Sequence, residues 1–470
     1  MVDVTNLTLQ DASKMLSSKQ IKAKELTEAF LDRTKKLNEK LNSFITITED
    51  IALKQAEKVD KLIEGNQKLP PLAGMPIGVK DLFCTKGIKT TAASKVLENY
   101  VPAYDSTVVS KIKDSQTVIL GKTNHDAWAH GASGENSDFG PTKNPYDLER
   151  VPGGSSSGSA AAVASGQCIA ALSTDTGGST RQPASFCNLV GIKPTYGRVS
   201  RYGVMAMASS LDTIGHMTKT VWDNAQILNV TAGNDTNDAT TSPRPVEDYI
   251  KEIEKGVKGK RIGLPREYFD GLDPKIKSVI DKASKELENL GAIISDISLP
   301  HTQYGIATYY IIVPSEISSN LARYDGIRYG NGRDSFGAEA KRRIILGTFA
   351  LSSGYYDAYY LKAMKVRRLI RDDFVNAFKN VDAIIAPVSP TLPFKIGEKV
   401  NDPLTMYLAD VYTVNVNLAG IPSLTVPAGF IDGLPVGMQV IGPDFSEKLL
   451  YQIGSAYEQK TKWYKSKPNI

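Results

Sequence analysis

Residues 153–185 read GGSSSGSAAAVASGQCIAALSTDTGGSTRQPAS, and 24 of these 33 residues are Gly, Ser, Ala or Thr. In isolation, such a composition is typical of a flexible linker. The order of the residues argues against a linker. A Gly-Gly-Ser opening is followed by an Ala-rich helical pattern, an apolar segment at 168–172 and the sequence DTGGS at 175–179. We therefore predict a helix and a strand here, bounded by tight glycine turns.

Two serines in this stretch, Ser155 and Ser179, each follow a pair of glycines. Glycine lets the backbone turn tightly and presents a hydroxyl and bare amide groups to the same small space. A serine becomes an effective nucleophile only when a base takes its proton. None of the chain's four histidines belongs to a Gly-x-Ser-x-Gly motif, since Ser179 is followed by Thr180 and Arg181.

A lysine offers a different base. Lys80 ends the short apolar segment GMPIGVKD at 74–81. A lysine on the rim of a sheet core can lose enough hydration for its neutral form to be populated near pH 7. By residue type alone, Lys80 would be an exposed lysine and Ser155 a helix cap. The spacing that links Lys80, Ser155 and Ser179 favours catalysis instead.

Lys80 in GVKD, Ser155 in GGSSSGS and Ser179 in DTGGSTRQPAS resemble the Ser-Ser-Lys constellation of the amidase signature family. The resemblance implies that family's α/β fold. The length of 470 residues would allow two or three average domains or one large α/β domain, and we expect the latter. Repeated alternation of strand and helix patterns independently favours a mixed or mostly parallel sheet covered on both faces. We expect a central mixed, mostly parallel twisted β-sheet covered by helices on both faces.

The organisation along the chain follows from the same patterns. Residues 1–65 read as a helical segment packed on the core, in which Thr8 and Asp11 resemble a capping box and Leu26, Phe30 and Leu37 recur at helical spacing. Residues 66–470 form the predicted amidase core, with strands near 77–79 and 118–120 and an inserted strand-helix-strand region around 255–300.

Composition places few limits on function. The 470 residues are 41% hydrophobic and 23% charged, as in a soluble globular protein, and a net charge of +5 argues neither for nor against nucleic acid. The three cysteines form no CxxC pair, which favours a reducing compartment. Because the N-terminus lacks a signal sequence and no apolar run reaches about 18 residues, we expect a cytoplasmic protein without a membrane contact.

Several tempting sites are excluded. Gly121-Lys122-Thr123 lacks the earlier glycine of a phosphate loop, because Gln116 stands in its place. The pair Gly330 and Gly332 lacks the third glycine of a dinucleotide fingerprint. We therefore expect no cofactor in this chain.

The segment NHDAWAHGASGENS at 124–137 has no metal-ligand spacing, so we expect no metal there. It resembles NMDEFAMGSSTENS of the family and should line the pocket. His125, Ala127 and His130 depart from that pattern. Their effect on pocket polarity and on any polar route for ammonia is left open by the sequence.

Three later passages, around 308–326, 341–348 and 407–413, narrow the resemblance. They are similar to the branch of the family whose members are glutaminase subunits of tRNA-dependent amidotransferases. The resemblance implies that Arg343 binds the α-carboxylate of glutamine and Asp410 its α-ammonium, with Tyr310 or its neighbour Tyr309 orienting the substrate. One cation and one anion in a partly dry pocket suit a zwitterion. By residue type alone, both charged residues would more often be surface or capping residues.

The implied mechanism assigns one role to each residue. Neutral Lys80 takes a proton from Ser155, which takes one from Ser179, whose Oγ attacks the side-chain amide of glutamine. Backbone amides of Thr176, Gly177 and Gly178, with that of Ser179, would hold the oxyanion. The family pattern also implies a cis peptide bond at Ser155.

The expected function is hydrolysis of glutamine, as the amido donor of a carbon-nitrogen ligase. The released ammonia would convert misacylated Glu-tRNA(Gln), Asp-tRNA(Asn) or both, a choice that the sequence leaves open. The resemblance implies a heterotrimer with an amidotransferase B subunit plus a small C subunit. ATP and Mg would then bind the partner, which would also make most contacts with tRNA. The alternatives are a stand-alone amidase for small or aryl amides and a catalytically silent scaffold protein.

Overall fold

The computed structural model describes residues 2–327 and 330–470. One sheet runs through these residues, in the order β1-β3-β2-β4-β6-β5-β10-β11-β9-β7-β8. Its strands are β1 (Phe44–Ile47), β2 (Pro76–Lys80), β3 (Val118–Thr123), β4 (Ala170–Asp175), β5 (Val190–Lys193), β6 (Thr213–Thr218), β7 (Arg261–Pro265), β8 (Ile293–Ile297), β9 (Ala383–Pro387), β10 (Ser423–Ile431) and β11 (Leu434–Ile441).

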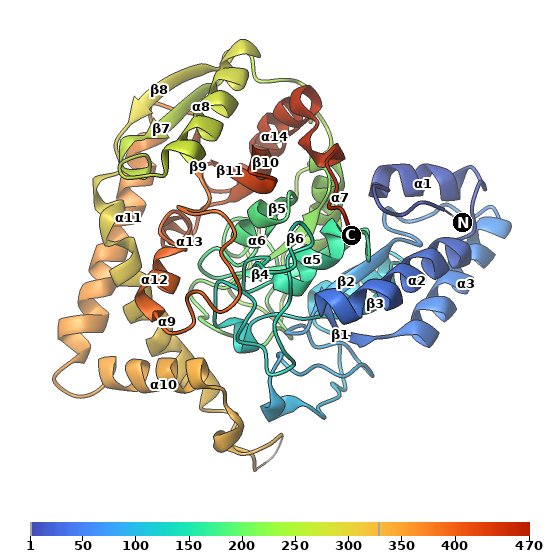
Figure 1. The fold of residues 1–470 in the computed structure, drawn as a ribbon, viewed down its shortest axis with the longest axis horizontal. Helices are drawn as coiled ribbons and strands as arrows, with labels where there is room; N and C mark the ends of the chain where they lie inside the picture. Colours follow the sequence, from blue (N-terminus) through green and yellow to red (C-terminus); the bar gives the residue numbers. More distant parts are fainter. Residues whose placement is uncertain (1, 328–329) are drawn as a thin grey trace.

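Helices pack around this sheet (Figure 1). They are α1 (Leu9–Ser17), α2 (Ala23–Leu41), α3 (Glu49–Glu64), α4 (Thr107–Asp114), α5 (Ser157–Ala164), α6 (Arg181–Phe186), α7 (Val221–Thr231), α8 (Pro274–Asn289), α9 (Gly305–Leu321), α10 (Ala338–Ala350), α11 (Lys362–Ala377), α12 (Pro403–Leu408), α13 (Val414–Ala419) and α14 (Glu447–Thr461).

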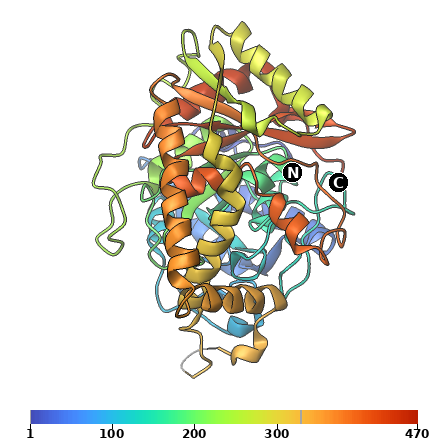
Figure 2. The same cartoon turned by 90° about the vertical axis from the view of Figure 1, so that its left-hand side faces the viewer.

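Both faces of the sheet are covered, as predicted. Helices α8 and α14 pack on β10 and β11, and α6 packs on the same two strands. Figure 2, turned by 90°, shows α8 above the red strands and the long helices α9 and α11 below them. The central strands β2 to β6 are accordingly buried along their whole length.

The sheet is mixed, as expected, but it is not mostly parallel. Six of the ten pairings between described strands are antiparallel. Strand β6 lies between β4 and β5 and runs antiparallel to both, although α6 alone links β4 to β5 along the chain. Strands β10 and β11 form a hairpin, which needs only a short turn.

The two ends of the sheet correspond to the two segments set apart in the sequence. Strand β1 pairs with β3 at one edge, beside α2 and α3, and the Thr8 hydroxyl accepts a hydrogen bond from Asp11 N at the start of α1. At the other edge, β7, α8 and β8 form the predicted strand-helix-strand unit, and β7 pairs in parallel with β8 and β9. The division into two domain segments remains a prediction.

The Ala-rich helix α5 explains why small residues dominate the stretch at 153–185. All eight of its residues are buried, and it packs on β2 and β4. Side chains no larger than valine let the helix approach the sheet closely. The described residues include no helix with the length and apolar character of a membrane span.

Candidate active site

Lys80 lies at the carboxyl end of β2, where it meets the Gly- and Ser-rich stretch at 153–185. Strands β2 and β4 are parallel neighbours, with Val79 opposite Leu172, so their carboxyl ends reach the same edge. The Lys80 Nζ lies 2.8 Å from the Oγ atoms of Ser155 and Ser156 and 2.8 Å from Thr174 Oγ1. The predicted contact between Lys80 and Ser155 is therefore present.

The surroundings of Lys80 favour its neutral form. Its side chain is fully buried, and no carboxylate among the described residues forms an ion pair with it. Burial lowers the pKa of Lys80 to about 7, against the opposing charges of Asp126, Asp175 and Asp212. A large fraction of the amine is therefore unprotonated near neutral pH and can accept a proton.

Ser179 lies on the turn between β4 and α6 and is 7% exposed. Its backbone carbonyl accepts a hydrogen bond from Ser156 N at 3.2 Å, which places the two serine segments side by side. The hydroxyls of Ser155 and Ser179 form no hydrogen bond with each other in the described structure, so the predicted link between them is not made directly. The Gly154–Ser155 peptide bond is cis, as the family pattern implied.

Sequence reasoning missed two of the three hydroxyls around Lys80. Ser156 gives no signal of its own, because its neighbour Ser155 carries the motif. Thr174 stands 94 residues from Lys80, and only the parallel pairing of β2 with β4 brings the two together. The polar end of β4, Ser173-Thr174-Asp175, was the available signal, because polar residues at a strand's carboxyl end often face a site.

Asp175 shapes the turn that carries Ser179. Its carboxylate accepts hydrogen bonds from the backbone amides of Gly178 at 3.0 Å and Thr180 at 3.2 Å. Gly178 has φ +137°, and a side chain there would meet Thr413, so the position requires glycine. Because the Gly178 amide is committed to Asp175, the oxyanion site proposed from the sequence is left with the amides of Thr176, Gly177 and Ser179. No acceptor for these three is present in the described residues.

Arg181 is the buried counter-ion of Asp175. Its guanidinium bonds both carboxylate oxygens at 3.0 Å and also donates to Gln439, Thr413 and Asn417. Burial alone would raise the pKa of Asp175, but the charge and hydrogen bonds of Arg181 outweigh burial and lower that pKa to about 2. The pair of Asp175 and Arg181 holds the turn that carries Ser179 against α13 and β11.

Arg181→Ala is expected to destabilise the fold by about 3–5 kcal/mol, because it leaves the Asp175 charge buried and unpaired. The shift of the midpoint of urea unfolding measures this effect. Arg150→Ala, which breaks a partly exposed pair with Asp147, is the matched control and should cost less than about 1 kcal/mol. Equal shifts for the two variants would contradict the prediction.

The two charged residues assigned to the substrate lie near this turn. Arg343 on α10 is 3% exposed, and Asp410, which precedes α13, is 7% exposed. Thr413 Oγ1 donates to the carbonyls of Gly177 and Asp410 and so ties the Asp410 segment to the turn. Burial raises the pKa of Asp410 to about 8, against the opposing charge of Arg343. The two charges influence each other without forming an ion pair.

The structure distinguishes the two candidate tyrosines. A side chain on Gly177 would lie 2.5 Å from Tyr309 Oη, so the hydroxyl of Tyr309 rests against the turn. That hydroxyl has no hydrogen-bond partner in the described part of the chain. Tyr310, the first choice from the sequence, instead stacks on Tyr407 with ring centroids 3.8 Å apart. Tyr309 is therefore the better placed of the two to contact a reacting group.

His125 and His130 are buried in the segment that was expected to line the pocket. His125 Nδ1 lies 2.7 Å from the Asp126 carbonyl, whereas His125 Nε2 and both ring nitrogens of His130 have no partner in the described structure. Burial lowers the pKa of both rings well below the usual value, so both are neutral. No cluster of three or more potential metal ligands occurs among the described residues.

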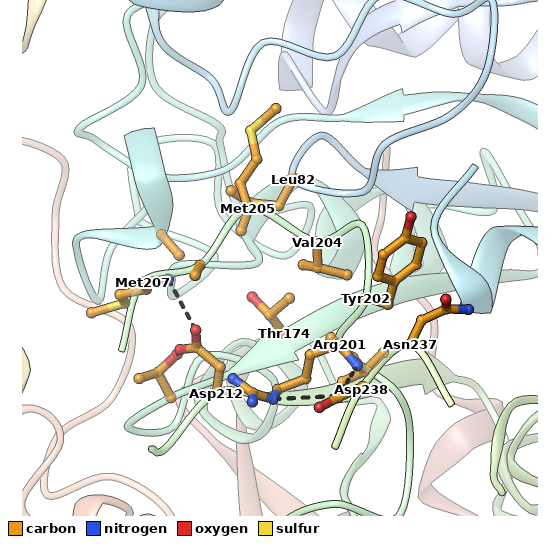
Figure 3. Close-up of a pocket in the computed structure, with 14 residues that line it drawn as sticks. Leu82, Thr174, Arg201, Tyr202, Val204, Met205, Met207, Asp212, Asn237 and Asp238 are labelled. Atoms are coloured by element: carbon orange, nitrogen blue, oxygen red, sulfur yellow. Dashed lines mark hydrogen bonds and ion pairs between the residues drawn. The ribbon is translucent and has the colours of Figure 1, made fainter. Parts of the chain in front are cut away.

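A cavity of about 160 Å³ lies behind the turn (Figure 3). Thr174 and Thr176 line it together with Arg201 and Asp238, whose charged groups are 3.8 Å apart. Asp212 accepts hydrogen bonds there from Thr176 Oγ1 and Met207 N. Arg343 and Asp410 do not line this cavity, so it is separate from the space beside these two charges.

Comparisons with known proteins agree with this geometry. A family model described as Amidase matches residues 25–451. The A subunit of glutamyl-tRNA(Gln) amidotransferase from Carboxydothermus hydrogenoformans is 51% identical over 480 residues, covering 99% of each chain.

Two solved structures are also similar. The A subunit of glutamyl-tRNA(Gln) amidotransferase from Thermotoga maritima is 45% identical with a TM-score of 0.85, covering 98% of this chain and 96% of that one. A bacterial aryl acylamidase of the amidase signature enzymes is 28% identical with a TM-score of 0.88, covering 98% of both chains. The fold alone therefore does not separate these two activities, whereas sequence identity favours the first.

Proposed function

This chain belongs to the amidase family, and on that premise we propose that it is the glutamine-hydrolysing component of a tRNA-dependent amidotransferase. The observation that carries the proposal is the placement of a buried guanidinium, Arg343, and a buried carboxyl group, Asp410, near the Ser179 turn without an ion pair between them. Free glutamine presents one carboxylate and one ammonium at its α-carbon. A stand-alone amidase for aryl substrates has no use for two such charges.

The proposed reaction begins with proton transfer from Ser179 through Ser155 to the neutral Lys80 amine. The Oγ of Ser179 then forms a bond to the side-chain amide carbon of glutamine, and the carbonyl electrons move to oxygen. The amides of Thr176, Gly177 and Ser179 hold that oxyanion. Hydrogen bonds of this kind often tighten only when substrate is bound, so the missing Ser155–Ser179 hydrogen bond is compatible with the relay.

The second half of the reaction returns the proton. The Lys80 ammonium gives it back through Ser155 to the departing nitrogen, the C–N bond breaks, and ammonia leaves the γ-glutamyl ester of Ser179. Water then attacks the ester carbon while Lys80 takes its proton through Ser155. The ester C–O bond breaks, glutamate leaves, and Lys80 returns the proton through Ser155 to the Ser179 oxygen. Each cycle therefore converts glutamine and water into glutamate and ammonia.

The substrate assignment is tested by comparing ammonia release from glutamine with ammonia release from an aryl or fatty amide. We expect glutamine to be preferred in kcat/KM. A clear preference for the hydrophobic amide would defeat the proposal in favour of a stand-alone amidase. Labelling of Ser179 by a serine-directed fluorophosphonate excludes the silent scaffold.

The rate of glutamine hydrolysis is expected to rise with pH through about 7. The pKa of Lys80 is lowered to about 7, and only the neutral amine accepts a proton, so activity appears as pH rises through that value. At saturating glutamine, kcat at pH 6 should be about tenfold below its plateau above pH 8. A kcat that stays constant from pH 6 to pH 8 would contradict the assignment of Lys80 as the base.

We further propose that the chain works in a heterotrimer with an amidotransferase B subunit plus a small C subunit. In this arrangement the partner binds ATP and Mg, contacts most of the tRNA and uses the ammonia, and the complex is cytoplasmic. Exposed apolar side chains on α10 and in the π-helical turn η6 (Tyr356–Leu361) support a contact with a partner. They are Ile345, Leu346, Phe349, Tyr356, Tyr359 and Leu361. Purification of the native protein with its stoichiometric partners tests this proposal.

A further inference from the structure

The arginine assigned to the substrate carboxylate is itself held by a carboxylate. Arg343 Nε donates a hydrogen bond of 2.7 Å to Glu339 Oε1, one helical turn earlier on α10. The side chains of Arg343 and Glu339 are 4% and 12% exposed, so solvent weakens this pair little. Tyr407 Oη also donates to Glu339 Oε1, at 3.4 Å, and the exposed Arg342 contacts the other Glu339 oxygen.

Two aromatic rings fix the guanidinium from a second direction. The Arg343 Cζ lies 5.5 Å from the ring centroid of Tyr310 and 5.9 Å from that of Tyr407. The two rings stack on each other, which gives them little freedom to move apart. Within the described residues, neither Nη atom of Arg343 donates a hydrogen bond. The end of the guanidinium that carries Nη1 and Nη2 is therefore available to a ligand.

The nearby Asp410 makes this restraint necessary. A buried arginine close to an unpaired buried carboxylate gains energy by pairing with it. Such a pair would use up both charges that the substrate needs. Glu339 offers Arg343 a different partner on its own helix, and the stacked rings of Tyr310 and Tyr407 lie against the guanidinium.

We propose that Glu339 is a positioning residue that holds Arg343 apart from Asp410, so that Nη1 and Nη2 grip the substrate carboxylate end-on. The inference rests on the proposed glutaminase function and concerns the same site. Glu339 does not touch the reacting amide. Its effect is therefore on binding of the charged end of glutamine, and the bond-breaking steps at Ser179 proceed unchanged.

Glu339→Ala in the full-length protein, purified with any bound partners, tests the inference. KM for glutamine is expected to rise about tenfold or more, as for loss of a hydrogen bond to a charged group, with kcat within about threefold of wild type. Glu339→Gln should restore most of the affinity, because its amide oxygen can still accept from Arg343 Nε. Arg342→Ala removes the exposed contact to Glu339 and should change KM by less than about twofold.

A second readout separates positioning from general damage to the fold. The rate at which a fluorophosphonate labels Ser179 depends on the serine machinery and not on Arg343, so Glu339→Ala should label at the wild-type rate. The inference is overturned if KM stays within twofold of wild type, or if labelling slows as much as glutamine turnover. Wild-type protein that labels normally but releases no ammonia from glutamine would instead overturn the proposed function.

Discussion

Ser179→Ala is expected to abolish ammonia release from glutamine, lowering kcat by about 10⁴-fold or more, as is usual when the nucleophile of a serine hydrolase is lost. The hydroxyl of Ser179 has no hydrogen-bond partner in the described structure, so its removal should leave the folded state intact. Ammonia release and the melting temperature are measured together. The mass of a trapped γ-glutamyl adduct, seen only in the wild type, identifies the missing step.

A second buried serine of the same stretch provides the control for this variant. Ser159 on α5 donates a hydrogen bond to the Leu172 carbonyl, and its hydroxyl is also hydrogen-bonded to that of Thr123. Both contacts lie away from the turn that carries Ser179. Ser159→Ala should lower the melting temperature slightly and keep the rate of glutamine turnover within a few-fold of the wild-type rate. Glutamine turnover by Ser179→Ala above about one per cent of wild type would exclude Ser179 as the nucleophile.

Lys80→Met is expected to lower kcat by about 10³–10⁴-fold, towards the upper end of what a general base contributes. Methionine fills most of the volume of the lysine side chain, so the packing should be preserved. The structural damage is then limited to the hydroxyls of Ser155, Ser156 and Thr174, which lose a hydrogen-bond partner. We expect the residual activity of Lys80→Met to be low and to lack the increase with pH near 7 that the wild type shows. Turnover is followed by ammonia release at several pH values.

Lys193→Met is the matched control for Lys80. Lys193 is also fully buried, and burial lowers its pKa to about 7, but within the described residues its Nζ donates only to the carbonyls of Pro194 and Ile421. It therefore shares the environment of Lys80 without the serines. The proton relay is wrong if Lys80→Met keeps near-full turnover, or if Lys193→Met loses as much activity as Lys80→Met.

Much of this site could be predicted because its parts lie at the ends of local patterns. The apolar run that ends at Lys80 specifies a short strand, and the Gly-Gly-Ser segments that contain Ser155 and Ser179 each specify a turn that precedes a helix. Parallel strands then bring these ends to one edge of the sheet, and the contact between Lys80 and Ser155 follows. The pair of Asp175 and Arg181 is similarly local, since its partners are six residues apart in the sequence.

Contacts that depend on strand order or helix packing could not be read from the sequence. The polar end of β4 marks Thr174 as a candidate site residue, but only the pairing of β2 with β4 shows that it lies beside Lys80. Nothing local to β6 shows that it separates β4 from β5. The choice between Tyr309 and Tyr310 depends on how α9 faces the turn, since adjacent residues on a helix point about 100° apart. The hydrogen bond from the Gly178 amide to Asp175 depends on the conformation of the turn at 175–179. The residue types in that turn allow this conformation but do not specify it.

The residues proposed to break the amide and the residues proposed to select it come from different parts of the chain. Lys80, Ser155 and Ser179 belong to the first 180 residues, whereas Tyr309, Arg343 and Asp410 belong to α9, α10 and the segment before α13. Retargeting such an enzyme, by natural evolution or in the laboratory, is therefore a matter of editing the later segments. Lys80, Ser155 and Ser179 can stay unchanged while substitutions in the later segments change which amide is bound.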